Sequence, residues 1–232
     1  MGGYENRRGE RVQWGQVFRS DHLAELGAAD WDQISELGIG LVADLRNDRE
    51  RARWPSAWPD HLGVEFMMRD YDMNLRQLNE VGYHTLAYQQ IELLRGFFRT
   101  LAQPDAPRVL IHCTAGQDRT GFACAFLLAL LEVPLETILQ DYSLSHHLRR
   151  HVAIDPEKAE ELITFYGLDS SVEEMVARQS LTVAERRAQA EARMAAALDH
   201  IAVEYGSLIG FVHDELQVDG ATAGEIRERL LV

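Results

Sequence analysis

The chain has 232 residues, of which 46% are hydrophobic, and its 37 acidic and 23 basic residues give a net charge of −14. This length and apolar content suffice for one substantial core, so we expect a single domain over residues 1–232. Nucleic acid is excluded as a partner, because binding it requires a basic face. A phosphate ligand must instead be held by a local positive pocket.

The N-terminal composition and the cysteine content indicate a cytoplasmic location. The first 20 residues are polar and carry four arginines, which is not the pattern of a secretory signal. No apolar run reaches membrane-spanning length. Two cysteines occur, Cys113 and Cys124, as suits a reducing compartment. We therefore expect a cytoplasmic protein without an integral membrane segment.

The predicted strands lie in the first half of the chain. Apolar runs bounded by glycine or charge indicate strands over residues 12–19, 39–45, 64–68 and 109–111. Between them, apolar spacing and capping residues predict a short helix after Ser20-Asp21, helices over residues 30–37 and 84–101, and a helical turn at Asn47, where Glu50 completes a near capping box. Residues 70–80 are polar and are expected to form a loop.

The second half of the chain is predicted to be helical. The expected helices cover residues 121–131, 135–147, 156–166, 172–178 and 183–203, with two short ones to the C-terminus. The early alternation of strands and helices favours an α/β fold with a central sheet flanked by helices and a helical C-terminal half.

The most informative segment joins the last predicted strand to the following helix. It reads His112-Cys113-Thr114-Ala115-Gly116-Gln117-Asp118-Arg119-Thr120-Gly121. A short loop in this position binds phosphate, because its backbone N–H groups point inward and the helix dipole favours negative charge. Cys113 would be a thiolate nucleophile at the base of the loop. Arg119 would clamp two phosphate oxygens with its planar fork.

The other residues of the segment have predicted supporting roles. Backbone N–H groups of the loop are expected to bind the substrate phosphate at Thr114, Ala115, Gly116 and Gln117, and Gly116 permits a backbone twist that a side chain would oppose. Thr120 is expected to bind the phosphate and to donate its hydroxyl to the Cys113 thiolate, and His112 is expected to orient the loop. The alternative is an inert buried cysteine, but the coincidence of so many compatible residues argues against it.

Three weaker signals lie outside or beside the loop. Asp44 and Arg46 are expected to support the loop through an ion pair, with a plain surface salt bridge as the alternative. Cys124 lies among apolar residues and is expected in the core, with a disulfide to Cys113 as the less favoured alternative. The basic stretch 145–151 either holds a second phosphate at the pocket rim or is a helix C-terminus that favours cations.

The segment resembles the signature of cysteine-dependent protein tyrosine and dual-specificity phosphatases, and the chain is similar to the bacterial tyrosine/serine phosphatase family typified by a mycobacterial enzyme. Further matching segments run in the family's order: Gly2-Gly3-Tyr4, Phe18-Arg19-Ser20, Asp44-Leu45-Arg46 with Glu50, Asp141-Tyr142 and Tyr205-Gly206-Ser207. The resemblance implies a tyrosine-phosphatase-like sheet, a cysteinyl-phosphate intermediate, no metal or other cofactor, and a phosphorylated protein or peptide as substrate.

Two departures from the family pattern bear on the N-terminus and on the substrate. Family members usually begin several residues upstream of Gly2 with an Arg-Asp segment, so we expect the first strand to be incomplete. Family loops commonly carry lysine where this chain has Gln117, and the lost charge disfavours phosphoinositides. We favour phosphotyrosine proteins, with phosphoserine or phosphothreonine in addition. The alternatives are a phosphoinositide or inositol-phosphate phosphatase and a non-catalytic phosphate-binding module.

Three aspartates are candidates for the general acid that protonates the leaving group. Asp118 lies within the loop, where the resemblance implies an acid, although it can also brace the loop. Asp72, with Asp70 nearby, follows the strand at 64–68, where other cysteine phosphatases carry their acid. Asp60, in Trp58-Pro59-Asp60, matches the acid loop of eukaryotic tyrosine phosphatases but precedes that strand, so it should lie at the opposite sheet edge. We favour Asp118, with Asp72 or Asp70 as the alternative.

Overall fold

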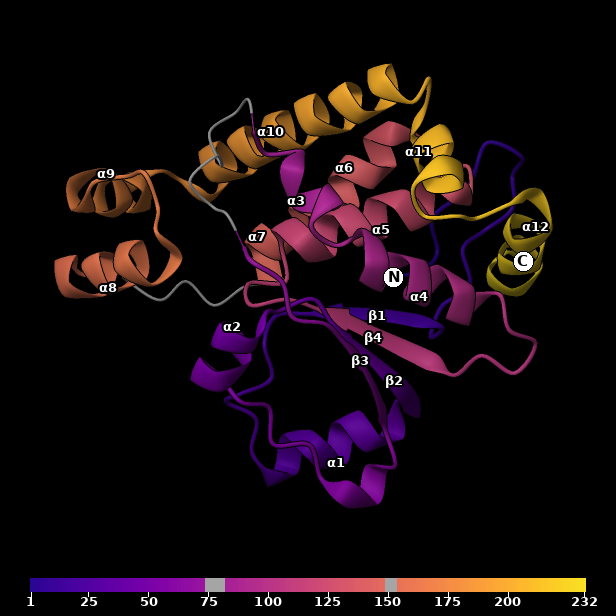
Figure 1. The fold of residues 1–232 in the computed structure, drawn as a ribbon, viewed down its shortest axis with the longest axis horizontal. Coiled ribbons are helices and arrows are strands. Elements are labelled where there is room, and N and C mark those ends of the chain that lie inside the picture. Colours follow the sequence, from indigo (N-terminus) through magenta and orange to yellow (C-terminus); the bar gives the residue numbers. More distant parts are fainter. Residues whose placement is uncertain (74–81, 149–153) are drawn as a thin grey trace.

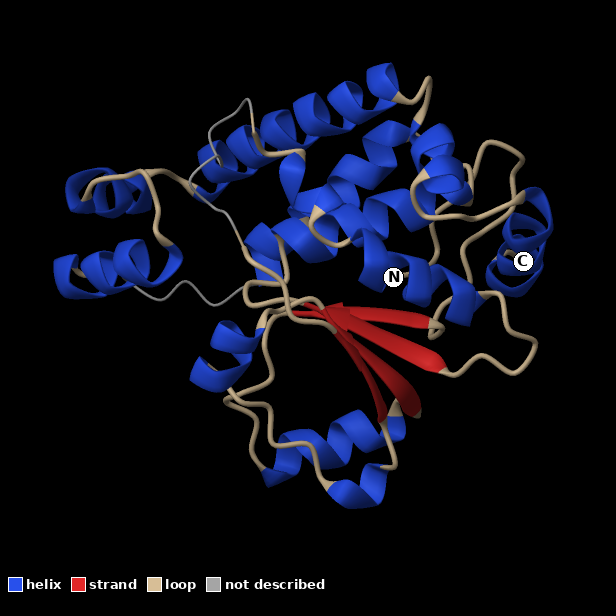
Figure 2. Ribbon diagram, viewed as in Figure 1, coloured by secondary structure: helices blue, strands red, loops and turns tan. Residues whose placement is uncertain are grey.

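The computed structural model describes residues 1–73, 82–148 and 154–232. Its centre is a parallel four-stranded sheet in the order β1-β4-β2-β3. The strands are β1 (Val17–Ser20), β2 (Ile39–Asp44), β3 (Glu65–Met68) and β4 (Arg108–His112). Helices lie on both faces of the sheet and make up most of the second half of the chain (Figures 1 and 2). The predicted α/β class is therefore confirmed.

The two central strands, β2 and β4, are apolar at their centres, over residues 41–43 and 109–111, because both of their faces are covered there. Side chains alternate between the faces of a strand. Accordingly Val109 and Ile111 of β4 pack in the larger core, whereas Leu110 packs in the smaller one. Such continuous apolar runs are typical of parallel strands buried on both sides.

The larger core lies under the helices that cover one face of the sheet. These helices are α3 (Thr85–Tyr88), α4 (Ile91–Leu101), α5 (Asp118–Leu130), α6 (Leu135–Ser143), α10 (Val183–Glu204), α11 (Leu208–Asp214) and α12 (Gly220–Leu230). Of these, α5 is buried along almost its whole length, as expected for a helix that is apolar all round. The smaller core lies under α1 (Ala28–Glu36), where Trp31 packs against Trp58.

Two short helices, α2 (Asp48–Arg53) and α7 (Ser145–Leu148), lie where the parallel strands end, which is also where β4 leads into the Cys113 loop (Figure 1). The helices α8 (Pro156–Tyr166) and α9 (Val172–Ala177) lie further out on the same side of the molecule (Figure 1). Single 3₁₀ turns occur at Asp60–Leu62 and Arg178–Ser180. In the described ranges no single helix is long and apolar enough to cross a membrane, although α10 and α11 meet that length and composition together across a 62° bend.

Several boundaries differ from the sequence-based prediction. The predicted helix after Ser20 is wrong, because the Ser20 hydroxyl donates to the Asp21 carbonyl at 2.8 Å and caps no helix. The helices predicted over 84–101 and 135–147 are each divided in two. At both breaks a backbone N–H bonds three residues back and not four, from Gln90 to Ala87 and from Leu144 to Asp141.

The first predicted strand is shorter than expected, and one loop prediction is only partly described. Only the end of the predicted strand 12–19 joins the sheet, and Val12 instead forms an isolated antiparallel bridge with Leu231. Residues 70–73 form a loop, as predicted, whereas 74–80 lie outside the described residues.

Candidate active site

The loop after β4 places Cys113 at the carboxyl edge of the sheet. Its side chain is 2% exposed. Gly116 takes a φ of +63°, and a Cβ there would lie 2.6 Å from the Ser20 carbonyl oxygen, so the curve of the loop requires glycine. The helix α5 begins two residues later, which points its N-terminal end at the loop. Thr114 and Ala115 are half-buried at the rim.

The back of the loop is tied to the sheet by Arg19 of β1. The Arg19 guanidinium donates to the Gly116 carbonyl at 2.9 Å and forms an ion pair with Asp141 at 2.6 Å. The Tyr4 hydroxyl donates to the other Asp141 oxygen at 2.8 Å. Three segments that carried the family resemblance thus meet behind the loop and hold its curvature.

Arg119 lies in the first turn of α5, with its guanidinium on a carboxylate from α2. Its two terminal nitrogens each donate to one oxygen of Glu50, both at 2.6 Å. The Leu45 carbonyl at 3.1 Å and the Tyr71 hydroxyl at 2.6 Å accept further bonds. The pair is buried, with Arg119 7% and Glu50 0% exposed. This bidentate contact fixes the plane of the guanidinium.

Glu50 is the residue of the site whose contact with Arg119 the sequence did not indicate. Burial alone would raise its pKa, but the hydrogen bonds and charge of Arg119 outweigh burial and lower it, so the pair is ionised. The hydroxyls of Thr114 and Tyr166 also donate to Glu50. The predicted capping box with Asn47 is present and is what directs Glu50 inward. That capping pattern was the available signal, but it points to a helix start and not to an arginine.

Asp118 begins α5 and faces the helical layer. Its carboxylate accepts from the Tyr83 hydroxyl and, at 3.4 Å, from the Tyr142 hydroxyl, and it lies 3.6 Å from the Arg193 guanidinium of α10. Burial raises the pKa of both tyrosines, so they are neutral donors. Its side chain remains 34% exposed, so a substrate can reach it.

Gln117 is buried beside Asp118. Its amide nitrogen donates to the Tyr142 hydroxyl at 3.2 Å and lies 3.2 Å from Nε2 of His146. The rest of the basic stretch 145–151 is only partly covered by the structure, since residues 149–153 lie outside the described ranges.

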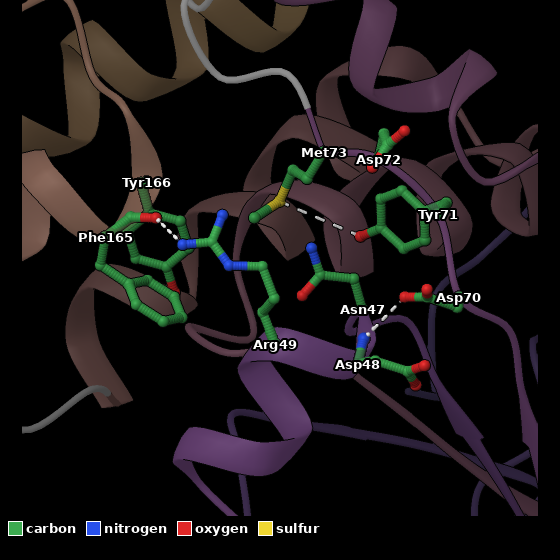
Figure 3. A pocket seen from close by; sticks show the side chains of 9 residues that line it. All are labelled: Asn47, Asp48, Arg49, Asp70, Tyr71, Asp72, Met73, Phe165 and Tyr166. Atoms are coloured by element: carbon green, nitrogen blue, oxygen red, sulfur yellow. Dashed lines mark hydrogen bonds between the residues drawn. The ribbon is translucent and has the colours of Figure 1, made fainter.

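The other candidate acids lie in different places. Asp72 is exposed and lines a hollow of about 130 Å³ beside the loop, whose walls include Tyr71 and Tyr166 (Figure 3). Asp70 lines the same hollow and accepts from the Asp48 N–H at 2.9 Å. Asp60 begins the turn before β3, at the sheet edge opposite the loop. The prediction that Asp60 lies at the opposite edge is confirmed, because Asp60 precedes β3 and β3 runs parallel to the other strands.

Asp44 and Arg46 form a buried ion pair, so the alternative of a surface salt bridge is wrong. Arg46 donates to both Asp44 oxygens, at 2.9 and 2.7 Å. Nε2 of His112 lies 3.7 Å from Asp44, and its Nδ1 lies 3.2 Å from the Cys113 carbonyl oxygen. Burial lowers the pKa of His112, which is therefore neutral at pH 7. His112 thus connects the Asp44–Arg46 ion pair to the Cys113 loop. That this ion pair supports catalysis stays a prediction.

One predicted contact of the loop, and one less favoured alternative, are not formed. The Thr120 hydroxyl is buried and has no hydrogen-bond partner among the described residues, so it does not donate to Cys113 here. Both cysteines are free, so the disulfide alternative is also not formed. Burial raises the pKa of Cys124 to about 12, which leaves that thiol neutral.

A free cysteine held between a parallel strand and the N-terminus of a buried helix, with an oriented arginine one turn into that helix, is the arrangement of loop-based cysteine phosphatases. The model of the tyrosine phosphatase family matches residues 1–232, and the chain belongs to that family. Its members are phosphoric monoester hydrolases.

Curated relatives carry phosphatase names. The chain is 31% identical to the triple specificity protein phosphatase PtpB of Mycobacterium tuberculosis, over 94% of this chain and 91% of that protein. It is 32% identical to a tyrosine-protein phosphatase homologue of Cupriavidus necator, over 61% of this chain and 57% of the relative. The chain is 35% identical to a tyrosine-protein phosphatase of Nostoc commune, over 56% of this chain and 48% of that protein. The matched regions thus span about half the length of the last two.

Proposed function

We propose that this chain hydrolyses phosphotyrosine in proteins through a cysteinyl-phosphate intermediate, with Cys113 as the nucleophile. The single observation that carries the proposal is the buried Arg119–Glu50 pair, which holds a guanidinium fork one turn into α5, the helix that follows the Cys113 loop. Backbone N–H groups of residues 114–119 and the N-terminal end of α5 supply the remaining donors to the phosphate. We further propose that residues 1–232 act as one catalytic domain.

In the first step, the Cys113 thiolate attacks phosphorus and an S–P bond forms. The bond between phosphorus and the leaving oxygen breaks, and its electron pair stays on that oxygen. Asp118 is our proposed general acid and gives its proton to the leaving oxygen. Arg119 balances the charge of the equatorial oxygens, while Glu50 keeps the fork aligned.

In the second step, water attacks phosphorus and gives its proton to the Asp118 carboxylate. The S–P bond breaks and its electron pair returns to the Cys113 sulfur, which restores the enzyme. The buried Thr120 hydroxyl is without a partner among the described residues and is free to turn toward the departing sulfur.

The substrate preference follows from charge and from the relative with the widest coverage. PtpB is named as a triple specificity enzyme, and we extend phosphoserine and phosphothreonine activity to this chain. Phosphoinositides are the less favoured alternative, because Gln117 brings no charge and its amide is already engaged by Tyr142. We place the enzyme in the cytoplasm, since both of its cysteines are free thiols.

The test is a panel of phosphotyrosine peptide, phosphoserine peptide and phosphoinositide substrates. Cys113→Ser should lower turnover by about 10⁴-fold or more, as for loss of a nucleophile. Cys124→Ser is the matched control, because it removes the other buried thiol, and it should keep its activity. Intact-mass analysis of quenched wild-type reactions should detect one added phosphoryl group on the protein, and peptide mapping should locate it on Cys113. Activity that survives Cys113→Ser would refute the covalent mechanism, and no wild-type turnover at all would favour the binding module.

A further inference from the structure

The guanidinium of Arg119 is held at one corner. Its Nη1 donates to three oxygens, namely Oε2 of Glu50 at 2.6 Å, the Tyr71 hydroxyl at 2.6 Å and the Leu45 carbonyl at 3.1 Å. A terminal guanidinium nitrogen carries two hydrogens, so these acceptors use it completely. The Nη1 corner is therefore bound to the protein and has no hydrogen left for a phosphate.

One edge of the same guanidinium stays available. Nη2 donates one hydrogen to Oε1 of Glu50 at 2.6 Å, and the Thr114 hydroxyl, at the rim of the loop, lies 3.4 Å from it. Within the described ranges, the hydrogen bonds of the Arg119 side chain come from its terminal nitrogens and not from Nε. A bidentate contact with phosphate needs two neighbouring N–H groups on one edge. Nε and Nη2 are therefore the donors left for the phosphate.

Tyr71 joins the Nη1 corner to the segment that follows β3. Its hydroxyl donates to the Leu45 carbonyl at 2.9 Å while it accepts from Arg119. Its ring lines the hollow beside the loop (Figure 3). Burial raises the pKa of Tyr71, so the phenol stays neutral at neutral pH and serves as donor and acceptor together. The hydroxyl thus bridges a cation on α5 and a backbone carbonyl that follows β2.

We propose, on the basis of the phosphatase function above, that Tyr71 is a positioning residue that keeps the Nε–Nη2 edge of Arg119 turned toward the phosphoryl group. Glu50 fixes the plane of the guanidinium, because its two oxygens bind both terminal nitrogens. That contact alone still lets the guanidinium rock along the carboxylate. The Tyr71 hydroxyl removes this freedom, because it holds the Nη1 corner from a second direction. In this role Tyr71 touches no reacting atom and acts only through Arg119.

The experiment measures kcat/KM of Tyr71→Phe, which keeps the ring and removes the hydroxyl. The value should fall about tenfold, the low end for a hydrogen bond to a charged group. Because Arg119 acts on the phosphoryl oxygens and not on the leaving group, the loss should be equal for a phosphoserine peptide and for an aryl phosphate. A residue that acted through the general acid would instead slow the phosphoserine peptide more. The ratio of the two losses therefore reports which group Tyr71 serves.

Inhibition by orthovanadate and by inorganic phosphate gives a second readout. Vanadate binds the Cys113 sulfur in a five-coordinate form like the transition state, so the S–V bond fixes its equatorial oxygens. Phosphate is bound as a tetrahedral ion and can tilt to follow a displaced guanidinium. Tyr71→Phe should therefore weaken vanadate inhibition about tenfold and phosphate inhibition less. The ratio of the two inhibition constants and the ratio of the two kcat/KM values do not depend on the fraction of folded protein.

Two further variants separate this role from a general effect on the fold. Tyr88→Phe is the matched control, because it removes a phenol hydroxyl that donates to Glu204 at the C-terminal end of α10, at 2.5 Å. Its kcat/KM should match the wild type. In an Arg119→Lys background, Tyr71→Phe should cause no further loss in kcat/KM, because lysine has no planar fork for the hydroxyl to align.

Four results would each overturn this role of Tyr71. They are wild-type kcat/KM in folded Tyr71→Phe, a larger loss with the phosphoserine peptide than with the aryl phosphate, equal weakening of vanadate and phosphate inhibition, and a further tenfold loss in the Arg119→Lys background. These results leave the phosphatase function standing. That function fails by a different readout, namely absence of wild-type turnover or survival of activity in Cys113→Ser.

Discussion

Replacing Glu50 by glutamine tests the contact that orients Arg119. The substitution keeps the size of the side chain but removes its charge, and it puts an NH₂ group where one oxygen accepted a guanidinium N–H at 2.6 Å. The guanidinium of Arg119 then stays buried with only part of its acceptors. We expect both the stability of the domain and the alignment of the phosphate clamp to suffer.

The expected magnitude follows from the burial of the pair. Removing one partner of a buried ion pair costs about 3–5 kcal/mol, and the remaining acceptors, Leu45 and Tyr71, place this case at about 3 kcal/mol. For a domain of this length, that loss lowers Tm by about 6–12 °C. Because the clamp acts on the transition state, kcat/KM should fall as well, by about 10²-fold.

The assay is urea unfolding of wild type and variant at several pH values. The pKa of Glu50 is lowered by folding, so its contribution is present above the unfolded value of about 4.3 and is lost as pH falls through the lower folded value. The difference in unfolding free energy should therefore be largest at neutral pH and shrink on acidification. Glu5→Gln is the control, because its pair with Arg11 is exposed on both sides and contributes little.

A difference below about 1 kcal/mol at neutral pH, within the range of surface pairs, would refute the reasoning. So would a difference that stays constant as the pH is lowered, because it would show that shape and not charge carries the effect. A kcat/KM equal to that of the wild type would show that Glu50 does not orient Arg119 for catalysis. The unfolding data would then decide separately whether Glu50 stabilises the domain.

Asp118→Asn should slow a phosphoserine peptide by about 10²–10⁴-fold and an aryl phosphate less, since the poorer leaving group depends more on the acid; equal kcat to wild type on both would remove Asp118 from that role. Gly121→Ala should cost about 1–3 kcal/mol in urea unfolding, because the new Cβ meets Tyr142 at 2.5 Å, whereas Gly224→Ala in open helical space should cost nothing. His112→Gln should flatten the wild-type loss of stability below about pH 6.5, because a histidine buried in its neutral form takes up its proton only after unfolding; an unchanged slope would contradict the assignment.

The sheet was predictable because its signal is local. Both central strands are apolar runs with abrupt ends, and the capping box at Asn47 fixed the start of α2. The missed breaks near Gln90 and Leu144 were not predictable, because the apolar spacing continues across them while the backbone tightens by one residue. A helical pattern reports which face is buried and not where the hydrogen-bond ladder is interrupted.

The site was predictable where its residues are contiguous and hidden where they are not. The loop from Cys113 to Arg119 could be assigned because strand, glycine and helix follow one another in the sequence. Glu50 lies 69 residues before Arg119 in the sequence. Arg193 comes far after Asp118, with which it forms an ion pair. Only the packing of α2 and α10 around α5 brings these pairs together, and no spacing rule encodes that packing. The exclusion of Asp60, by contrast, needed only strand direction, which the order of the elements supplied.

The acidic composition predicts that phosphate is held by a locally positive pocket. The structure shows which groups around the loop carry positive charge and how that charge is balanced. Three arginines around the loop have a carboxylate within ion-pair distance: Arg19 has Asp141, Arg119 has Glu50 and Arg193 has Asp118. The charge of each of these three arginines is therefore largely balanced by its own carboxylate. Phosphate recognition must rest on the loop N–H groups, the N-terminus of α5 and one fork oriented by Glu50. This balance of charge, together with the neutral Gln117, supports our proposal that the chain acts on phosphoproteins in preference to phosphoinositides.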